Sequence, residues 1–94
     1  MSDRLGVVRS DRYLHDLQAV HDFIEGDNQD AAMQLLLHIE EQVDSLSDPN
    51  FPRRQGRKPG TLELVVHRNY VVVLTQTATT VIAVNLLHVA RQYP

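Results

Sequence analysis

The sequence contains no cysteine, which excludes disulfide bridges, cysteine-ligated metals and a thiol nucleophile. It also lacks a long apolar run, so we expect no segment to cross a bilayer. The start of the chain is polar and is not followed by the apolar stretch of a secretory signal. We therefore expect a soluble, cytoplasmic protein made of one domain over residues 1–94.

Each half of the chain is poor in charge of one sign. Residues 1–50 carry three arginines against eleven acidic residues, which gives a net charge of −8. Residues 51–94 carry six arginine or lysine residues against Glu63 alone, which gives +5. A basic half of this kind is suited to an anion or an acidic partner. The alternative is that the two halves only complement each other within the fold.

The acidic half predicts two amphipathic helices. Ser10 and Asp11 can cap a helix that starts near Arg12 and ends at Glu25, with Gly26 suited to the C′ position. Its apolar stripe consists of Leu14, Leu17, His21 and Ile24, with Val20 and Phe23 beside it. Asn28 can cap the second helix, which Ser47-Asp48-Pro49 ends. The short link between them predicts an antiparallel helical hairpin.

The basic half predicts strands. The β-rich runs are Thr61–His67, Tyr70–Thr77 and Thr80–Leu87. Tight turns at Arg68-Asn69 and Ala78-Thr79 join them into an antiparallel meander, and Asn69 is able to take a positive φ. Near the start of the chain, Leu5–Arg9 is a weaker run and a plausible edge strand.

Between the helices and the meander lies a basic loop, Arg53–Gly60. Its Gly56, Pro59 and Gly60 argue against a regular element there. The element order is therefore β-α-α-β-β-β. This order predicts an α+β fold in which the N-terminal helical hairpin packs on one face of an antiparallel sheet.

Three segments resemble motifs of one known family. Asp27–Ala32 resembles the Asn-Pro-x-Ala-Ala start of its second helix. Gly56–Val66 resembles its Gly-Arg…Gly-Thr-Arg-Glu-Leu-Val segment, and Val84–Pro94 resembles its ending, Val-Leu-x-Val-x-His-x-x-Arg-x-(Trp/Tyr)-Pro. By these motifs and their order, nearly the whole chain resembles the RelE/ParE superfamily of bacterial type II toxins.

The resemblance implies one of two activities. Toxins like RelE cut messenger RNA in the ribosomal A site, where the 2′-OH attacks its own phosphate and cations stabilise the developing charge. Toxins like ParE cut nothing and poison DNA gyrase. In the RelE-like enzymes, the strand that corresponds to Tyr70–Thr77 starts with a Tyr followed by a catalytic Arg. Here Val71 follows Tyr70. The missing cation and a pI near 5.9 favour the ParE branch, because RNA binding depends on neutralising phosphates.

Two alternatives stay open. If the chain is a ribosome-dependent endoribonuclease, its candidate catalytic residues are Arg57, Lys58, His88 and Arg91. The chain is otherwise a degenerate, non-toxic family member, a hypothesis motivated by Val71 and by Leu62, where the family usually has Arg. In each case we expect no cofactor and no metal, because the helical histidines lack the spacing of metal ligands.

We interpret the loop and the C-terminal tail as a binding surface first and a catalytic site second, converging near one sheet edge. The candidate residues are Arg53, Arg54, Arg57, Lys58, His67, Arg68, Tyr70, His88, Arg91, Gln92 and Tyr93. The alternative is that the loop cations are merely solvated and that Glu63 pairs with Arg57 or Arg91. The resemblance also implies a cognate antitoxin that neutralises the toxin in a hetero-oligomer, and its helix is expected to face Leu36, His38 and Gln42.

Overall fold

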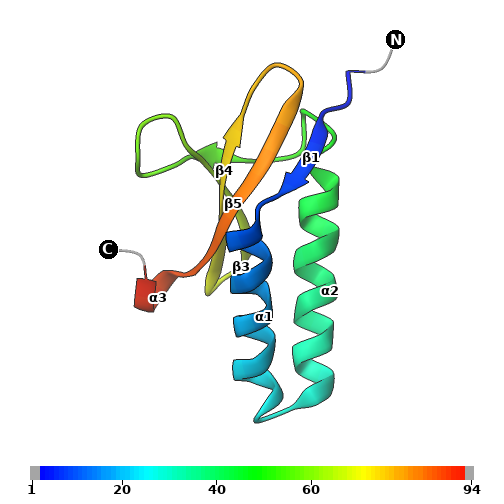
Figure 1. Cartoon of the computed structure of the whole chain (residues 1–94), viewed down its shortest axis with the longest axis vertical. Coiled ribbons are helices and arrows are strands. Elements are labelled where there is room, and N and C mark those ends of the chain that lie inside the picture. Colours follow the sequence, from blue (N-terminus) through cyan, green and yellow to red (C-terminus); the bar gives the residue numbers. More distant parts are fainter. Residues whose placement is uncertain (1–2, 93–94) are drawn as a thin grey trace.

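The computed structural model describes residues 3–92 as a helical hairpin packed on a five-stranded sheet (Figure 1). The helices are α1 (Asp11–Glu25), α2 (Gln29–Ser45) and a short α3 (Val89–Gln92). The strands are β1 (Gly6–Arg9), β2 (Arg54–Gln55), β3 (Leu62–His67), β4 (Tyr70–Gln76) and β5 (Thr80–His88). They lie in the order β1-β5-β4-β3-β2. No helix within residues 3–92 is long and apolar enough to cross a membrane.

The predicted α+β order is confirmed, as is the antiparallel meander of β3, β4 and β5. Two features of the sheet differ from the expectation. The edge strand β1 runs parallel to β5, so the sheet is mixed; such a pairing needs a long connection, which α1, α2 and the first strands of the meander provide. In addition, part of the basic loop forms β2, which pairs with Leu62 and Glu63. The turn within Gly56–Gly60 reverses the chain and brings these residues into register.

The helix starts are as the sequence predicted. Ser10 Oγ accepts a hydrogen bond from Tyr13 N at 3.0 Å, and Asn28 Oδ1 accepts one from Ala31 N at 3.0 Å. The expectations of special backbone geometry were wrong. Gly26 has an ordinary helical φ of −57°. Asn69 does not have a positive φ either, since among the described residues only Gly60 does.

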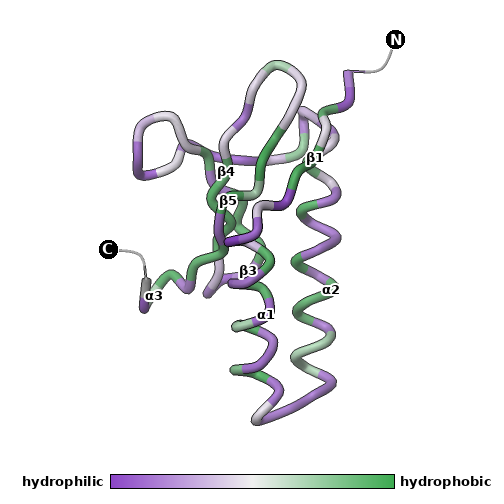
Figure 2. Tube along the Cα trace, in the orientation of Figure 1, coloured by the Kyte–Doolittle hydropathy of each residue, from purple (hydrophilic) through white to green (hydrophobic). Residues whose placement is uncertain are grey.

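The core lies between the hairpin and the covered face of the sheet. Its members from the hairpin include Leu17, Ile39, Val43 and Leu46, the last of which caps the end of α2. Its strand members include Leu64, Val72, Leu74, Val81 and Leu86. Figure 2 shows the central strands as apolar and the turn between α1 and α2 as hydrophilic. The predicted stripe of α1 was wrong at one position, because Tyr13 is 0 % exposed while Leu14 is 45 % exposed.

Tyr13 points inward, and its hydroxyl has a hydrogen-bond partner on the facing helix. It donates to Glu40 Oε1 on α2 at 2.8 Å. Arg9 at the end of β1 holds the other carboxylate oxygen of Glu40 at 3.1 Å and reaches Asp44 at 2.6 Å. Burial, together with the bond to Glu40, raises the pKa of Tyr13, so its hydroxyl stays a neutral donor. These four residues tie β1, α1 and α2 together.

A second set of bonds holds α1 to β5 where the β4–β5 register shifts. Val73 pairs with Asn85 and Leu74 with Ala83, which leaves Val84 without a partner on β4. Ser10 Oγ donates to the Val84 carbonyl at 2.6 Å. Two residues further along β5, Asp16 Oδ2 accepts from Leu86 N at 3.1 Å. The side chains of α1 thus satisfy backbone groups of β5 that the neighbouring strands leave unpaired.

The Tyr13→Phe substitution tests the first set of bonds. We expect it to lower the free energy of unfolding by about 1–2 kcal/mol, because Glu40 loses a buried hydrogen-bond donor. Urea denaturation of the purified chain measures the difference. The matched control is Tyr70→Phe, whose hydroxyl makes no hydrogen bond within residues 3–92, and which should change the free energy by less than about 0.5 kcal/mol. Equal losses from both substitutions would contradict the stabilising role of the Tyr13 hydroxyl.

Candidate functional site

The strand register divides the predicted binding surface into two groups. His67 pairs with Tyr70, and Tyr70 pairs with His88, so the three lie side by side at one end of the sheet. Arg54 pairs with Glu63 near the other end of β3. The steps from Glu63 to His67 span roughly 13 Å at the rise of a β-strand. The strand register therefore keeps the two groups apart, and the expected convergence near one sheet edge is not observed.

The first group is the basic loop, whose shape depends on two glycines. A Cβ at Gly56 would clash with Thr61 Oγ1, and Gly60 has a φ of 83°, which glycine adopts readily. Thr61 Oγ1 donates to the Lys58 carbonyl at 2.7 Å, and Gly56 N donates to the Thr61 carbonyl at 2.9 Å. These bonds define the loop, which displays the exposed side chains of Arg57 and Lys58.

The first two arginines of the basic loop make bonds within the protein. Arg53 donates to the Asp48 carbonyl at 2.6 Å, to the Phe51 carbonyl at 3.0 Å and to Gln76 Oε1 at 2.9 Å. Its partial burial lowers the pKa of the guanidinium, against the opposing charge of Asp48. Arg53 therefore links the chain before β2 to the end of β4.

Arg54 pairs with Glu63, the only acidic residue in the basic half of the sequence. Its Nε lies 2.9 Å from Glu63 Oε1, and Glu63 is 2 % exposed. Arg57 or Arg91 was the expected partner of this carboxylate, and the pairing with Arg54 was not predicted. The pairing of β2 with β3 brings the two side chains together, so only a prediction of β2 would have found it.

The second group surrounds Tyr70 at the C-terminal end of β5. The Tyr70 ring meets the His88 ring edge-on at 5.1 Å between centroids, and the His67 ring lies 5.9 Å away on its other side. His67 Nδ1 accepts from Asn69 N at 3.1 Å, and His88 Nδ1 accepts from Ala90 N at 3.2 Å. In the neutral rings these bonds leave the proton on Nε2.

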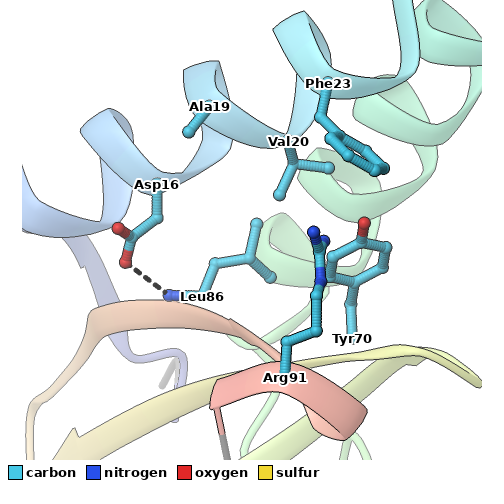
Figure 3. A pocket seen from close by; sticks show the side chains of 7 residues that line it. All are labelled: Asp16, Ala19, Val20, Phe23, Tyr70, Leu86 and Arg91. Atoms are coloured by element: carbon cyan, nitrogen blue, oxygen red, sulfur yellow. Dashed lines mark hydrogen bonds between the residues drawn. The ribbon is translucent and has the colours of Figure 1, made fainter.

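A pocket of about 310 Å³ opens beside this group, between α1 and the end of β5 (Figure 3). It is lined by Asp16, Ala19, Val20, Phe23, Tyr70, Leu86 and Arg91. The guanidinium of Arg91, on α3, lies over the Phe23 ring at 4.6 Å from its centroid. Phe23 is 62 % exposed, and the Tyr70 hydroxyl points into the pocket from below. Phe23 and Asp16 were not predicted as pocket residues, because only the fold brings α1 beside α3.

The other candidates have simpler surroundings. Arg68 is exposed in the turn between β3 and β4. The Gln92 side chain and Tyr93 lie outside the described residues.

On α2, His38 is exposed as expected of a partner-facing residue, whereas Leu36 packs against the core. Gln42 lines a second pocket with Phe51, Pro52 and Leu64. The exposed apolar residues of α2 are Met33 and Leu37.

Within residues 3–92, one group could share a cation: His21, Asp22 and Glu25 on α1, whose ligand atoms lie within 4.8 Å of one another. His21 Nδ1 lies 3.4 Å from Asp22 Oδ1 and 3.3 Å from Glu25 Oε2. Hydrogen bonds lower the pKa of Asp22, and the bond from Gln18 has a larger effect than the bond from His21. The carboxylates of Asp22 and Glu25 are exposed on the helix surface. Their contacts with His21 explain why the three side chains lie close together.

Comparisons with known proteins agree with the fold and with the motifs. Residues 7–93 match the family described as the ParE toxin of the type II toxin–antitoxin system parDE. No curated protein matches the sequence. Among solved structures, a chain described as the chromosomal ParDE toxin–antitoxin system from P. aeruginosa superposes with a TM-score of 0.80. The two chains are 18 % identical, and the match covers 93 % of this chain and 98 % of the other. The chain therefore belongs to the ParE toxin family of type II toxin–antitoxin systems.

Proposed function

We propose that the chain arrests growth by binding and inhibiting DNA gyrase, without catalysis of its own, and that its antitoxin neutralises it. The observation that carries this proposal is the division of the cations into two groups at opposite ends of β3. A site that cleaves RNA needs a base and several cations within hydrogen-bond reach of one phosphate. Arg57 and Lys58 lie with one group, whereas His88 and Arg91 lie with the other.

Two further features favour binding over RNA cleavage. Val71, at the position where the RelE-like enzymes carry a catalytic Arg, is 1 % exposed, so no cation reaches the surface from there. The chain also has a net charge of −3, which opposes association with the phosphates of messenger RNA. We therefore assign the exposed cations to contacts with another protein instead of with RNA.

The proposed gyrase-binding surface is narrower than the sequence suggested. Arg53 and Arg54 are engaged in internal bonds, so their side chains contribute mainly to the shape of the basic loop. Arg57 and Lys58 are exposed in the turn of this loop, and we assign the gyrase contacts to them because of this exposure. Arginine is enriched among the residues that dominate protein interfaces, and a shaped loop loses little conformational freedom on binding.

The need for an antitoxin follows from open surfaces on the toxin. β2 pairs only with Leu62 and Glu63, so the rest of β3 has no neighbouring strand on that side in the described chain. The exposed Val65 lies on this edge, and Met33 and Leu37 are exposed on α2. An open apolar strand edge associates readily with other chains unless a partner covers it.

The first test uses the purified chain, freed of antitoxin, in two assays run side by side. We expect it to inhibit DNA supercoiling by gyrase and to leave ribosome-bound messenger RNA intact. Re-addition of the antitoxin should restore supercoiling. Cleavage of the messenger RNA with active gyrase would refute the proposal in favour of the endoribonuclease. A chain that does neither, and does not arrest growth, would be the degenerate family member.

The second test concerns the loop. The double substitution Arg57→Gln, Lys58→Gln should raise the concentration that inhibits half of the gyrase activity by about five- to tenfold, because two charged contacts are lost. Arg4→Gln, which removes one charge from an exposed residue ahead of β1, serves as the control and should leave inhibition unchanged. Undiminished inhibition by the double variant would place the gyrase-binding surface elsewhere.

A further inference from the structure

The pocket between α1 and α3 combines apolar walls with two polar donors. Ala19, Val20 and Leu86 form its apolar part, and the Phe23 ring flanks it. Asp16 is also in the wall, but its two carboxylate oxygens already accept from Arg12 Nε and from Leu86 N. The polar character left to a ligand therefore comes from Arg91 and Tyr70.

Both donors lack a hydrogen-bond partner within residues 3–92. The described contact of the Arg91 guanidinium is with the Phe23 ring, and no carboxylate of that part of the chain pairs with it. Tyr70 is 4 % exposed, its ring is fixed between two histidines, and its hydroxyl reaches the pocket without an acceptor. A cation held by stacking beside a fixed hydroxyl donor is ready to bind a carboxylate.

We propose that this pocket binds an apolar side chain of the antitoxin together with a carboxylate next to it in the antitoxin chain. The carboxylate accepts from Arg91 and from the Tyr70 hydroxyl, and the apolar side chain packs against Val20, Leu86 and the face of Phe23. A volume of about 310 Å³ accommodates one or two side chains of a peptide segment. A folded domain could not enter it.

Charge complementarity determines the choice of occupant. The pocket lies where the acidic helix α1 meets the C-terminal part of a segment, residues 51–94, with a net charge of +5. An apolar residue with a single adjacent acid satisfies Arg91 without bringing excess negative charge against Asp16 and Asp22. A polyanion such as RNA or DNA would meet these carboxylates, so its phosphates are disfavoured. The assignment to the antitoxin rests on one part of the proposed function, the neutralisation of the chain by an antitoxin, and not on the identity of the target.

The test measures the affinity of the full-length chain for its full-length antitoxin by calorimetric titration. Arg91→Gln should weaken binding by about 10- to 100-fold, because a charged hydrogen bond inside an interface is lost. Tyr70→Phe should weaken it by about three- to tenfold and leave the stability of the toxin unchanged. Arg4→Gln, with the same loss of charge outside the pocket, should alter the affinity by less than about twofold.

A double-mutant cycle then identifies the carboxylate. Each Asp and Glu in the C-terminal half of the antitoxin is replaced by Asn or Gln and titrated against the wild-type toxin and against R91Q. One acidic position should lose affinity with the wild-type toxin and lose nothing further with R91Q. If no acidic position couples to Arg91, or if R91Q and Y70F bind as tightly as the wild type, the inference is overturned.

The same variants separate this inference from the proposed function. If the wild-type chain fails to inhibit gyrase but the coupling to Arg91 is found, the proposed target is wrong and the antitoxin pocket stands. If R91Q instead loses gyrase inhibition while its affinity for the antitoxin is unchanged, the pocket binds the target, and the assignment to the antitoxin is overturned.

Discussion

The attachment of α1 to the shifted part of β5 is the constraint on which the geometry of this toxin depends. Backbone groups that β4 and β1 leave unpaired would be costly to bury, and Ser10 and Asp16 satisfy two of them from the same helix. Ser10 also caps α1, so the start of the helix and its position against the sheet are set by one side chain. The gap between α1 and the end of β5 follows from this attachment, and that gap is the pocket.

Patterns local in the sequence predicted most of the fold. Periodicity, caps and turn residues predicted the hairpin, the meander and the edge strand, because each depends on neighbours in the chain. Apart from the backbone geometry of Gly26 and Asn69, the failures concern long-range pairing. Tyr13 is buried because Glu40 lies across the hairpin, and Arg54 meets Glu63 only because a two-residue strand forms in a glycine-rich loop. Neither contact has a signal in the residues around it.

The candidate site shows the same limit. The composition correctly indicated which part of the sequence holds the cations. It does not show which residues pair across the strands, so the two separate groups were predicted as one. The pairing of Tyr70 with His88 shows that the end of β5 lies at the far end of β3 from the basic loop. A toxin with two separated basic regions can bind its target with one and its antitoxin with the other. A single catalytic centre would require them to meet.

The parallel pairing of β1 with β5 also determines when the toxin can form. Gly6 pairs with Thr80 and Arg9 with Ala83, so the first strand finds its partner only after more than seventy further residues have been made. α1 depends on the same late strand through Val84 and Leu86. Contacts between such distant segments form slowly. The helical hairpin therefore leaves the ribosome before the strand that positions it, and during that interval its apolar face is uncovered.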